Sequence, residues 1–362
     1  MKILAIETSC DETSAAVIED GSRILSNIIA SSLSLHQKTG GIIPEVAARK
    51  QQEFIIPVVE KALRQAKSDI GEGVQHPKEL FEDIDLIAVT IGPGLIGSLL
   101  IGVETAKTLS LAINKPLVGV NHIHAHLYAN WLTAGNLPKF PAIGLVVSGG
   151  HTELFLISSH EKITWLGGTR DDAAGEAFDK TARLLNLGYP GGPVIAAAAA
   201  QYQISKIKNQ KEIRLPRPMM YEDNLDFSFA GLKTAVMREV IKLKSNQQFN
   251  NLAIQQLANE IQESITDVLV KKTLSSVKKY QVKTILLGGG VAANKRLTEK
   301  FRLEIRNFLP AGEAGKSEIN LHIPPPALCT DNAAYIASFA FYHQKLIPWQ
   351  EIKADPQLPV EV

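Results

Sequence analysis

The sequence has few cysteines, no long apolar run and almost no excess of charge of one sign. Its two cysteines among 362 residues, Cys10 and Cys329, exclude a disulfide-stabilised scaffold and indicate a reducing compartment. No apolar run approaches the roughly 20 residues that a helix needs to span a bilayer. The first apolar stretch, residues 3–6, is too short for a signal peptide. We therefore expect a cytoplasmic protein that does not associate with membranes.

The charges nearly cancel, with 38 Lys and Arg against 37 Asp and Glu. A net charge of +1 excludes a uniformly basic protein that coats nucleic acid, but it permits a local basic patch. The length predicts two domains at about 150 residues each. We expect an N-terminal α/β domain over residues 1–138, a C-terminal α/β domain over 139–340 whose last helix packs back, and a tail over 341–362.

Strands alternate with helices along the chain, which predicts an α/β fold with mostly parallel sheets. A strand, a small polar turn and a second strand begin the chain, and the same order returns at residues 142–157, which indicates two related halves. Residues 67–82 are expected to form a loop, and residues 201–250 to be irregular. We expect helices over residues 44–66, 95–112, 122–133, 173–185, 252–280, 292–307 and 332–343.

Histidines are concentrated in one of these helices. His122 and His126 are four residues apart and share one helix face, which is a spacing typical of metal ligands, whereas His124 points elsewhere. The glutamate of the HExxH metalloprotease motif is missing. Asp331, at the expected start of the last helix, is a candidate third ligand, although it can equally serve as the N-cap of that helix.

Small polar or glycine-rich turns follow several expected strands. Residues 92–94, 148–150 and 288–290 let backbone N–H groups approach a phosphate, but none matches the P-loop sequence. Asp11 and Glu12 lie in the turn after the first strand, where ligands bind in open α/β sheets. These acids can act as a general base, orient an amine, hold a cation, or simply form a solvated turn.

Eight segments together resemble the TsaD family, also called Gcp or Kae, from residue 1 to about residue 341. In chain order they are IETSCDET, VNHIHAH, LVVSGGHTEL, DDAAGEAFDKTARLL, YPGGP, FSFAGLKTAV, LLGGGVAAN and LCTDNAAYIA. The resemblance implies the fold of acetate kinase, sugar kinases, Hsp70 and actin, with two α/β domains and nucleotide in the cleft between them.

The resemblance also implies an activity. The family transfers a threonylcarbamoyl group from threonylcarbamoyl-AMP to the exocyclic amine of the tRNA adenosine just 3′ of the anticodon, in tRNAs that read codons beginning with A. The products are N6-threonylcarbamoyladenosine and AMP. The bacterial partners implied are TsaB and the ATPase TsaE, with a TsaC-type enzyme making the donor.

Site residues carry over from the family at matching positions. The metal ligands implied are His122, His126 and Asp331, a set that suits Fe(II), with Zn(II) also feasible. The implied substrate contacts are Leu145, Val146, Val147, Ser148, Gly149, Asp179, Gly192 and Asn294. Asp11 or Glu12 would orient the amine and take its proton, and Glu12 is the preferred base. Many members carry an acid where this chain has Ala196, which puts one ligand hydrogen bond in doubt.

Other functions remain open on the residues alone. A small-molecule kinase of the same superfamily would use ATP and Mg²⁺ without the two histidines. A non-catalytic scaffold like the paralogue TsaB would lack the metal ligands. The family's former label as a peptidase is disfavoured because this chain lacks the glutamate of the HExxH motif.

One segment is strongly basic although the chain as a whole is nearly neutral. Residues 271–306 hold ten basic residues and two acidic ones, so the segment is net +8 and the rest of the chain is −7. This segment is a candidate tRNA surface, and the alternative is a pair of solvated helix faces.

Overall fold

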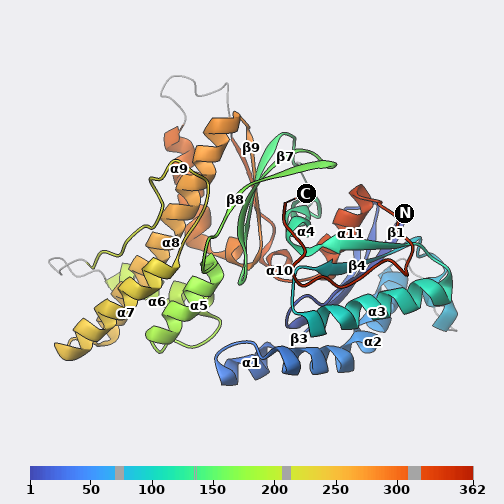
Figure 1. The fold of residues 1–362 in the computed structure, drawn as a ribbon, viewed down its shortest axis with the longest axis horizontal. Helices are drawn as coiled ribbons and strands as arrows, with labels where there is room; N and C mark the ends of the chain where they lie inside the picture. Colours follow the sequence, from blue (N-terminus) through green and yellow to red (C-terminus); the bar gives the residue numbers. More distant parts are fainter. Residues whose placement is uncertain (70–76, 134, 136, 206–212, 309–318, 362) are drawn as a thin grey trace. The chain divides into compact units, whose positions relative to one another are not determined.

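The computed structural model describes residues 1–69, 77–133, 135, 137–205, 213–308 and 319–361 (Figure 1). The chain forms two compact units. Unit 1 comprises Met1–Pro138, Ser159–Ile163 and Pro324–Val362, and unit 2 comprises Lys139–Ser158 and Thr164–Ile323.

Unit 1 is a five-stranded sheet between two layers of helices, with the strand order β3-β2-β1-β4-β5. Strand β1 pairs antiparallel with β2 and parallel with β4. Its strands are β1 (Lys2–Glu7), β2 (Glu12–Glu19), β3 (Arg23–Ser31), β4 (Leu86–Gly92) and β5 (Leu117–Asn121). Its helices are α1 (Leu33–Thr39), α2 (Pro44–Asp69), α3 (Ile96–Ile113), α4 (His122–Tyr128), α10 (Pro326–Cys329) and α11 (Ala333–Tyr342), with 3-10 turns at Pro77–Phe81 and Ala129–Trp131.

Alternation of apolar side chains along β1 explains both layers of unit 1. Leu4 and Ile6 enter a core with residues of α2 and α3, on one face of the sheet. Helix α11 is apolar and almost entirely buried, and it packs against β1, β2 and α4. Figure 1 shows α2 and α3 on one side of these strands and α11 on the other. Because both faces are covered, the central strand β1 is buried along nearly its whole length.

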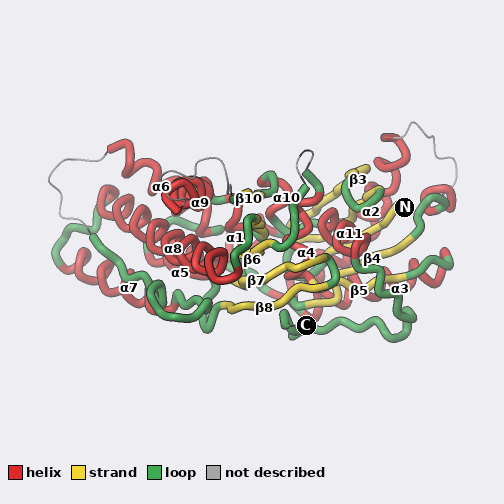
Figure 2. The backbone as a smooth tube through the Cα atoms, turned by 90° about the horizontal axis from the view of Figure 1, so that it is seen from above, coloured by secondary structure: helices red, strands yellow, loops and turns green. Residues whose placement is uncertain are grey.

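Unit 2 repeats the same sheet architecture with the order β8-β7-β6-β9-β10. Strand β6 pairs antiparallel with β7 and parallel with β9, as β1 does with β2 and β4. Its strands are β6 (Ala142–Val147), β7 (Thr152–Ser159), β8 (Lys162–Gly168), β9 (Thr284–Gly288) and β10 (Asn320–His322). Its helices, red in Figure 2, are α5 (Ala174–Leu184), α6 (Gly191–Ser205), α7 (Ala230–Ser245), α8 (Asn251–Tyr280) and α9 (Lys295–Phe308), with a 3-10 turn at Gly290–Ala293.

The two matching sheets confirm the predicted pair of related α/β halves. The prediction of mostly parallel sheets is wrong, because three strands of unit 1 form an antiparallel meander and only two further strands add in parallel. Residues 324–340, predicted to belong to the second domain with the last helix packing back, lie in unit 1, because α11 covers the second face of its sheet.

The predicted irregularity of residues 201–250 holds for residues 213–229 but is wrong for residues 201–205, which belong to α6, and for α7, while residues 206–212 lie outside the described residues. Helix α6 is so uniformly apolar that it shows no amphipathic period, and α7 follows a turn-rich stretch that obscures its start. In α7 the buried residues recur at helical spacing, at Leu232, Val236, Val240 and Leu243. Within the predicted loop at 67–82, α2 continues to Asp69 and a 3-10 turn forms at Pro77–Phe81, while residues 70–76 lie outside the described residues.

Helix α3 corrects the expectation that no segment could span a membrane. Among the described helices it alone is long and apolar enough by length and composition, with 18 residues at a mean hydropathy of 1.4. It packs against α2 and β4 in unit 1, and 33% of it is buried. A helix of an α/β layer passes the same test, so α3 is explained as a layer helix with a partly exposed apolar face.

An aromatic cluster fixes the C-terminal end of α4. Tyr128, the last residue of α4, is buried and its hydroxyl lies 2.9 Å from Nδ1 of His160. The His160 ring stacks on Tyr342 with centroids 3.9 Å apart, and His343 donates to the His160 carbonyl. Burial, with a smaller contribution from His343, lowers the pKa of His160 to about 4.

This cluster predicts sensitivity of the fold to acid. The neutral form of His160 stabilises the folded state above the unfolded pKa of about 6.5, and that contribution is lost as the pH falls from there towards 4. We expect the urea midpoint to drop across this window, and to drop less in His160→Gln, which cannot acquire the charge. Parallel pH profiles of the two proteins would contradict the assignment.

Candidate active site

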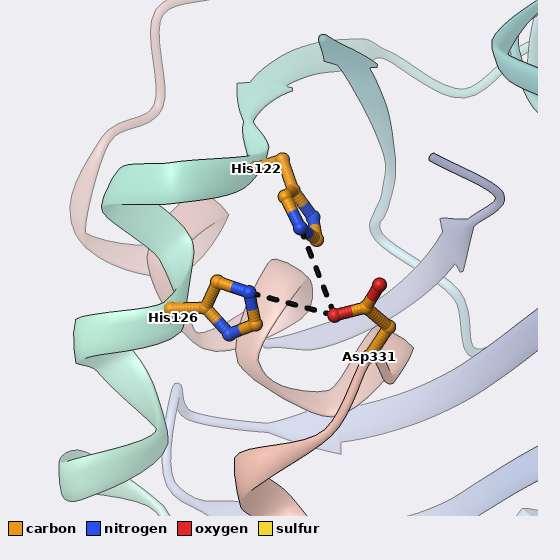
Figure 3. Close-up of side chains that lie close together, drawn as sticks. All are labelled: His122, His126 and Asp331. Atoms are coloured by element: carbon orange, nitrogen blue, oxygen red, sulfur yellow. Dashed lines mark ion pairs between the residues drawn. The ribbon is translucent and has the colours of Figure 1, made fainter. Parts of the chain in front are cut away.

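The predicted histidine pair lies at the start of α4, and Asp331 faces it. Asn121 caps α4 by accepting hydrogen bonds from the amides of Ile123 and His124. The Oδ1 atom of Asp331 is 3.7 Å from Nε2 of His122 and 3.5 Å from Nε2 of His126, as Figure 3 shows. All three ligand atoms lie within 4.8 Å of one another, so the structure brings together the three residues that the sequence nominated.

Asp331 is available to this cluster because it does not cap a helix. The N-cap of α11 is Asn332, whose side chain accepts a hydrogen bond from the amide of Ala334. The alternative role considered for Asp331, as the N-cap of the last helix, is therefore wrong. Its carboxylate instead accepts a long hydrogen bond, 3.4 Å, from the hydroxyl of Tyr335.

A second carboxylate, that of Glu7, orients the ring of His122 through its Nδ1 atom. Oε2 of Glu7, at the end of β1, lies 3.2 Å from Nδ1 of His122 and accepts a hydrogen bond from Thr90. Oε1 of the same residue accepts from the amide of Ser9 at 2.5 Å. With Nδ1 engaged by Glu7, the Nε2 atom of His122 faces Asp331, which is the carboxylate–histidine arrangement typical of metal centres.

Burial and crowding of charge shift the ionisation of this cluster. Burial opposes the imidazolium of His122, but the carboxylates of Glu7 and Asp331 outweigh it and raise its pKa to about 9. Burial, together with Glu7 and Asp11, raises the pKa of Asp331 above its ordinary value. Burial and the carboxylates of Asp11 and Asp331 raise the pKa of Glu12 far above its usual range.

The chemistry of this donor set fits a divalent cation. Two imidazole nitrogens and one carboxylate oxygen form a facial set that leaves coordination positions open, as in non-haem iron sites, and Zn(II) accepts the same donors. A cation would also offset the negative charge of carboxylates that otherwise become protonated. His122, His126 and Asp331 can therefore bind a metal.

The predicted substrate contacts of unit 2 lie at the carboxyl ends of β6 and β9 and in the helices that follow. The side chains of Leu145, Val146 and Val147 are buried, so β6 can offer a ligand only backbone groups. Val147 is close to Gly289, where a Cβ would collide with its carbonyl oxygen. These two strand ends therefore meet at one edge of the sheet.

Several glycines at this edge leave open space. A Cβ added to Gly149, Gly150, Gly192 or Gly290 meets no atom within 4 Å, so these positions leave room for a ligand beside the backbone. The turn at 92–94 differs. A Cβ on Gly92 would collide with the carbonyl oxygen of Asp355, and one on Gly94 would crowd Ser9. Close packing of unit 1 thus accounts for the glycines of the 92–94 turn, one of the three turns that could approach a phosphate.

The polar candidates of unit 2 are partly engaged by the fold. Oδ1 of Asp179 accepts a hydrogen bond of 2.6 Å from the amide of Gly191 and so fixes the start of α6. Asn294 accepts from the amide of Leu297 at the start of α9 and donates to Gln262 at 3.1 Å. Ser148 accepts from the amide of His151. Asp179 retains a second carboxylate oxygen for a ligand hydroxyl.

Sequence reasoning missed the residues that support the metal ligands. Glu7 stands inside IETSCDET and Tyr335 inside LCTDNAAYIA, but neither has a spacing that links it to a histidine. The role of Glu7 follows from strand pairing, which brings it to His122, 115 residues away. Tyr335 lies four residues after Asp331, and this spacing is the signal that could have found it.

The duplicated sheets define a class of protein. Full-length HypF in the phosphate- and nucleotide-bound form matches with a TM-score of 0.54 at 13% identity, covering 95% of this chain and 46% of that chain. HypF from T. kodakarensis matches at 0.53 and 13%, covering 97% and 49%. The chain is an α/β protein with the two-domain acetate/sugar kinase–Hsp70–actin-like fold.

Its relatives define the family within this class. The family model described as TsaD, tRNA N6-adenosine threonylcarbamoyltransferase, matches residues 23–338. The protein of that name from Syntrophomonas wolfei is 47% identical over 343 residues, covering 94% of this chain and 92% of the relative. That from Geobacillus thermodenitrificans is 44% identical over 364 residues, covering 99% and 96%. The chain belongs to the tRNA N6-adenosine threonylcarbamoyltransferase family.

The geometry predicts which substitutions remove the metal. His126→Ala and Asp331→Asn each delete one of three ligands, so we expect metal affinity to fall by at least about 100-fold, more than the loss of a supporting hydrogen bond usually costs. Metal content by mass spectrometry and a binding titration check this. His322→Gln, at a histidine of β10 in unit 2, should keep the metal. Equal metal content in all three variants would contradict the site.

Proposed function

We propose that this protein is a metal-dependent tRNA N6-adenosine threonylcarbamoyltransferase. It would transfer threonylcarbamoyl from threonylcarbamoyl-AMP to the exocyclic amine of the adenosine 3′ of the anticodon. The amine nitrogen forms a bond to the carbamoyl carbon, the bond between that carbon and the AMP phosphate oxygen breaks, and the amine loses a proton. The cluster of His122, His126 and Asp331 in a chain of this family carries the proposal. A kinase of the same fold or a scaffold paralogue would not need that cluster.

His122, His126 and Asp331 would hold the metal, with Fe(II) first and Zn(II) as the alternative. When bound, the metal supplies positive charge that stabilises developing negative charge on the donor. Glu7 keeps His122 oriented towards the cluster through Nδ1, and Tyr335 does the same for Asp331. The protein's own part is to keep these side chains in place before the substrate arrives.

We propose that Asp11 rather than Glu12 takes the proton of the amine. Burial and the carboxylates of Asp11 and Asp331 raise the pKa of Glu12, the base preferred from sequence, and this favours its protonated form. Its Oε1 also lies 3.2 Å from the hydroxyl of Ser31. A protonated carboxyl can donate a hydrogen bond but cannot accept a proton, which leaves Asp11 for that role.

Unit 2 would hold the nucleotide end of the donor. Support comes from the open backbone at Gly149, Gly192 and Gly290, which suits a phosphate or a ribose. The remaining oxygen of Asp179 would accept hydrogen bonds from ribose hydroxyls, and Asn294 would contact the nucleotide from the start of α9. Ala196, on α6, offers no carboxylate to this site.

An exposed apolar face on α2 and α3 supports a protein partner. Ile56 on α2 is 60% exposed, and Ile96 and Leu100, one turn apart on α3, are 49% and 44% exposed. The two helices pack together, and only 33% of α3 is buried. Such a face is typical of an interaction surface, and we propose that it binds TsaB, with TsaE completing the assembly in the cytoplasm and a TsaC-type enzyme supplying the donor.

The activity is tested with purified protein, threonylcarbamoyl-AMP, unmodified tRNA, TsaB, TsaE and ATP. We expect N6-threonylcarbamoyladenosine in the digested tRNA by mass spectrometry, and little of it when TsaB and TsaE are left out. Asp11→Asn should lower the rate by on the order of 10²–10⁴, the usual contribution of a general base. Glu12→Gln, which imitates the protonated carboxyl, should lose much less.

Two outcomes would contradict these assignments. No modified nucleoside with every component present, together with phosphorylation of a small molecule by ATP, would favour the kinase alternative. A loss in Glu12→Gln as large as in Asp11→Asn would return the role of base to Glu12.

Only part of the basic segment 271–306 is available as a tRNA surface. Lys272 is buried and donates to the carbonyls of Glu222 and Asn224, while Arg296 and Lys300 form ion pairs with Glu263. These three cations belong to the fold of unit 2. The exposed cations that remain are Lys271, Lys278, Lys279, Lys283, Lys295, Arg302 and Arg306. We propose that the group at the end of α8 contacts tRNA phosphates.

A charge reversal tests this surface. The triple variant Lys278→Glu, Lys279→Glu and Lys283→Glu should weaken tRNA binding and lower the slope of log Kd against log salt by about one for each phosphate that is no longer neutralised. The matched control reverses three exposed lysines of unit 1, Lys38, Lys345 and Lys353, for the same change in net charge. Equal affinities and slopes in both variants would show that the α8 end is a solvated face.

A further inference from the structure

The C-terminal tail, residues 343–361, packs along unit 1 and ends beside α4 (Figure 1). Ile352 is 1% exposed and belongs to the core beneath β1 and β4. The amide of Asp355 donates to the carbonyl of Ile91 at 2.7 Å, and the amide of Gly94 donates to the carbonyl of Pro356 at 3.3 Å. The tail is therefore hydrogen-bonded both to the end of β4 and to the turn that follows it.

Gly92 shows how closely the tail and this turn fit. It has a φ of +153°, and a Cβ at this position would collide with the carbonyl oxygen of Asp355. Asp355 also accepts from the amide of Gln357 through its side chain at 2.9 Å, which turns the tail towards β5.

Beyond this turn the tail reaches the helix of the metal ligands. Oδ1 of Asn121 accepts from the amides of Ile123 and His124, at 2.9 and 3.3 Å, while its Nδ2 donates to the carbonyl of Pro359 at 3.1 Å. One side chain thus caps α4 and binds the tail. Nε2 of His124, which is 4% exposed, donates to the carbonyl of Val360 at 3.0 Å.

We propose that residues 355–360 are a strap that holds the first turn of α4, and with it His122 and His126, in the geometry that binds metal. Helix α4 has seven residues, too few to be stable by itself, so its direction depends on its cap and its neighbours. Asn121 and His124 are then positioning residues, and His124 has a role although it faces away from the metal. The inference rests on the metal centre of the proposed function.

The test compares the full chain with a chain that ends at Pro356 and lacks both carbonyl acceptors. Co(II) serves as the probe in a spectroscopic titration, and hydrogen exchange reports on the amides of Ile123 and His124. We expect Co(II) affinity to fall by about 10–100-fold, the usual effect of losing a supporting hydrogen bond. Exchange of both amides should become faster, while that of the buried β1 amides stays unchanged.

Point variants keep the inference testable if the shortened chain folds poorly. His124→Leu should weaken Co(II) binding in the full chain and add little in the shortened one, whereas His124→Gln, which retains an N–H donor, should recover part of the loss. Lys353→Ser, at an exposed position of the tail, is the control and should change neither measurement.

Unchanged Co(II) affinity and unchanged exchange in the shortened chain would overturn the strap. If the full chain binds no Co(II), the metal centre fails, and the exchange rates of α4 still decide whether the tail restrains this helix.

Discussion

Unit 1 depends on the pairing of buried carboxylates with buried imidazoles. Glu7, at the end of the central strand, is 1% exposed, and the ring of His122 beside it is also removed from water. An isolated charge at such a depth is strongly unfavourable, so each group requires its partner. Asp331 adds a further carboxylate to the same cluster, and burial together with the neighbouring carboxylates raises the pKa of Asp331 and that of Glu12. The excess of negative charge is what makes the cluster suited to a cation.

The sequence predicts the metal ligands of this cluster better than it predicts the residues that orient them. The four-residue spacing of His122 and His126 determines that both rings leave one side of a helix, and the structure confirms it. Asp331 could not be separated from the capping residue by sequence, because aspartate and asparagine are both good N-caps and stand side by side here. The structure gives the cap to Asn332 and the free carboxylate to Asp331. Glu7 could not be linked to His122, because their contact exists only through the pairing of β1, β4 and β5.

The fold was predictable to a similar depth. Alternating strands and helices and the repeated strand–turn–strand pattern revealed two α/β halves, and the two sheets share one strand order. The antiparallel third strand of each half was not predicted, because β3 and β8 are partly exposed and lack a clear apolar period. Helix α6 escaped prediction for the opposite reason, since its uniform apolar composition conceals the helical period. Tertiary packing determines both kinds of element more than local sequence does.

The discontinuity of unit 1 has a consequence for synthesis on the ribosome. Its first 138 residues emerge early, but α11 and the tail, within Pro324–Val362, follow unit 2 in the chain. Until these emerge, one face of the first sheet lacks α11, and both histidine ligands lack their carboxylate. All of the residues of unit 2 leave the ribosome before then. The nascent protein must therefore keep an apolar sheet face covered by other means while unit 2 is translated, and it can bind a metal through all three ligands only after Asp331 has emerged.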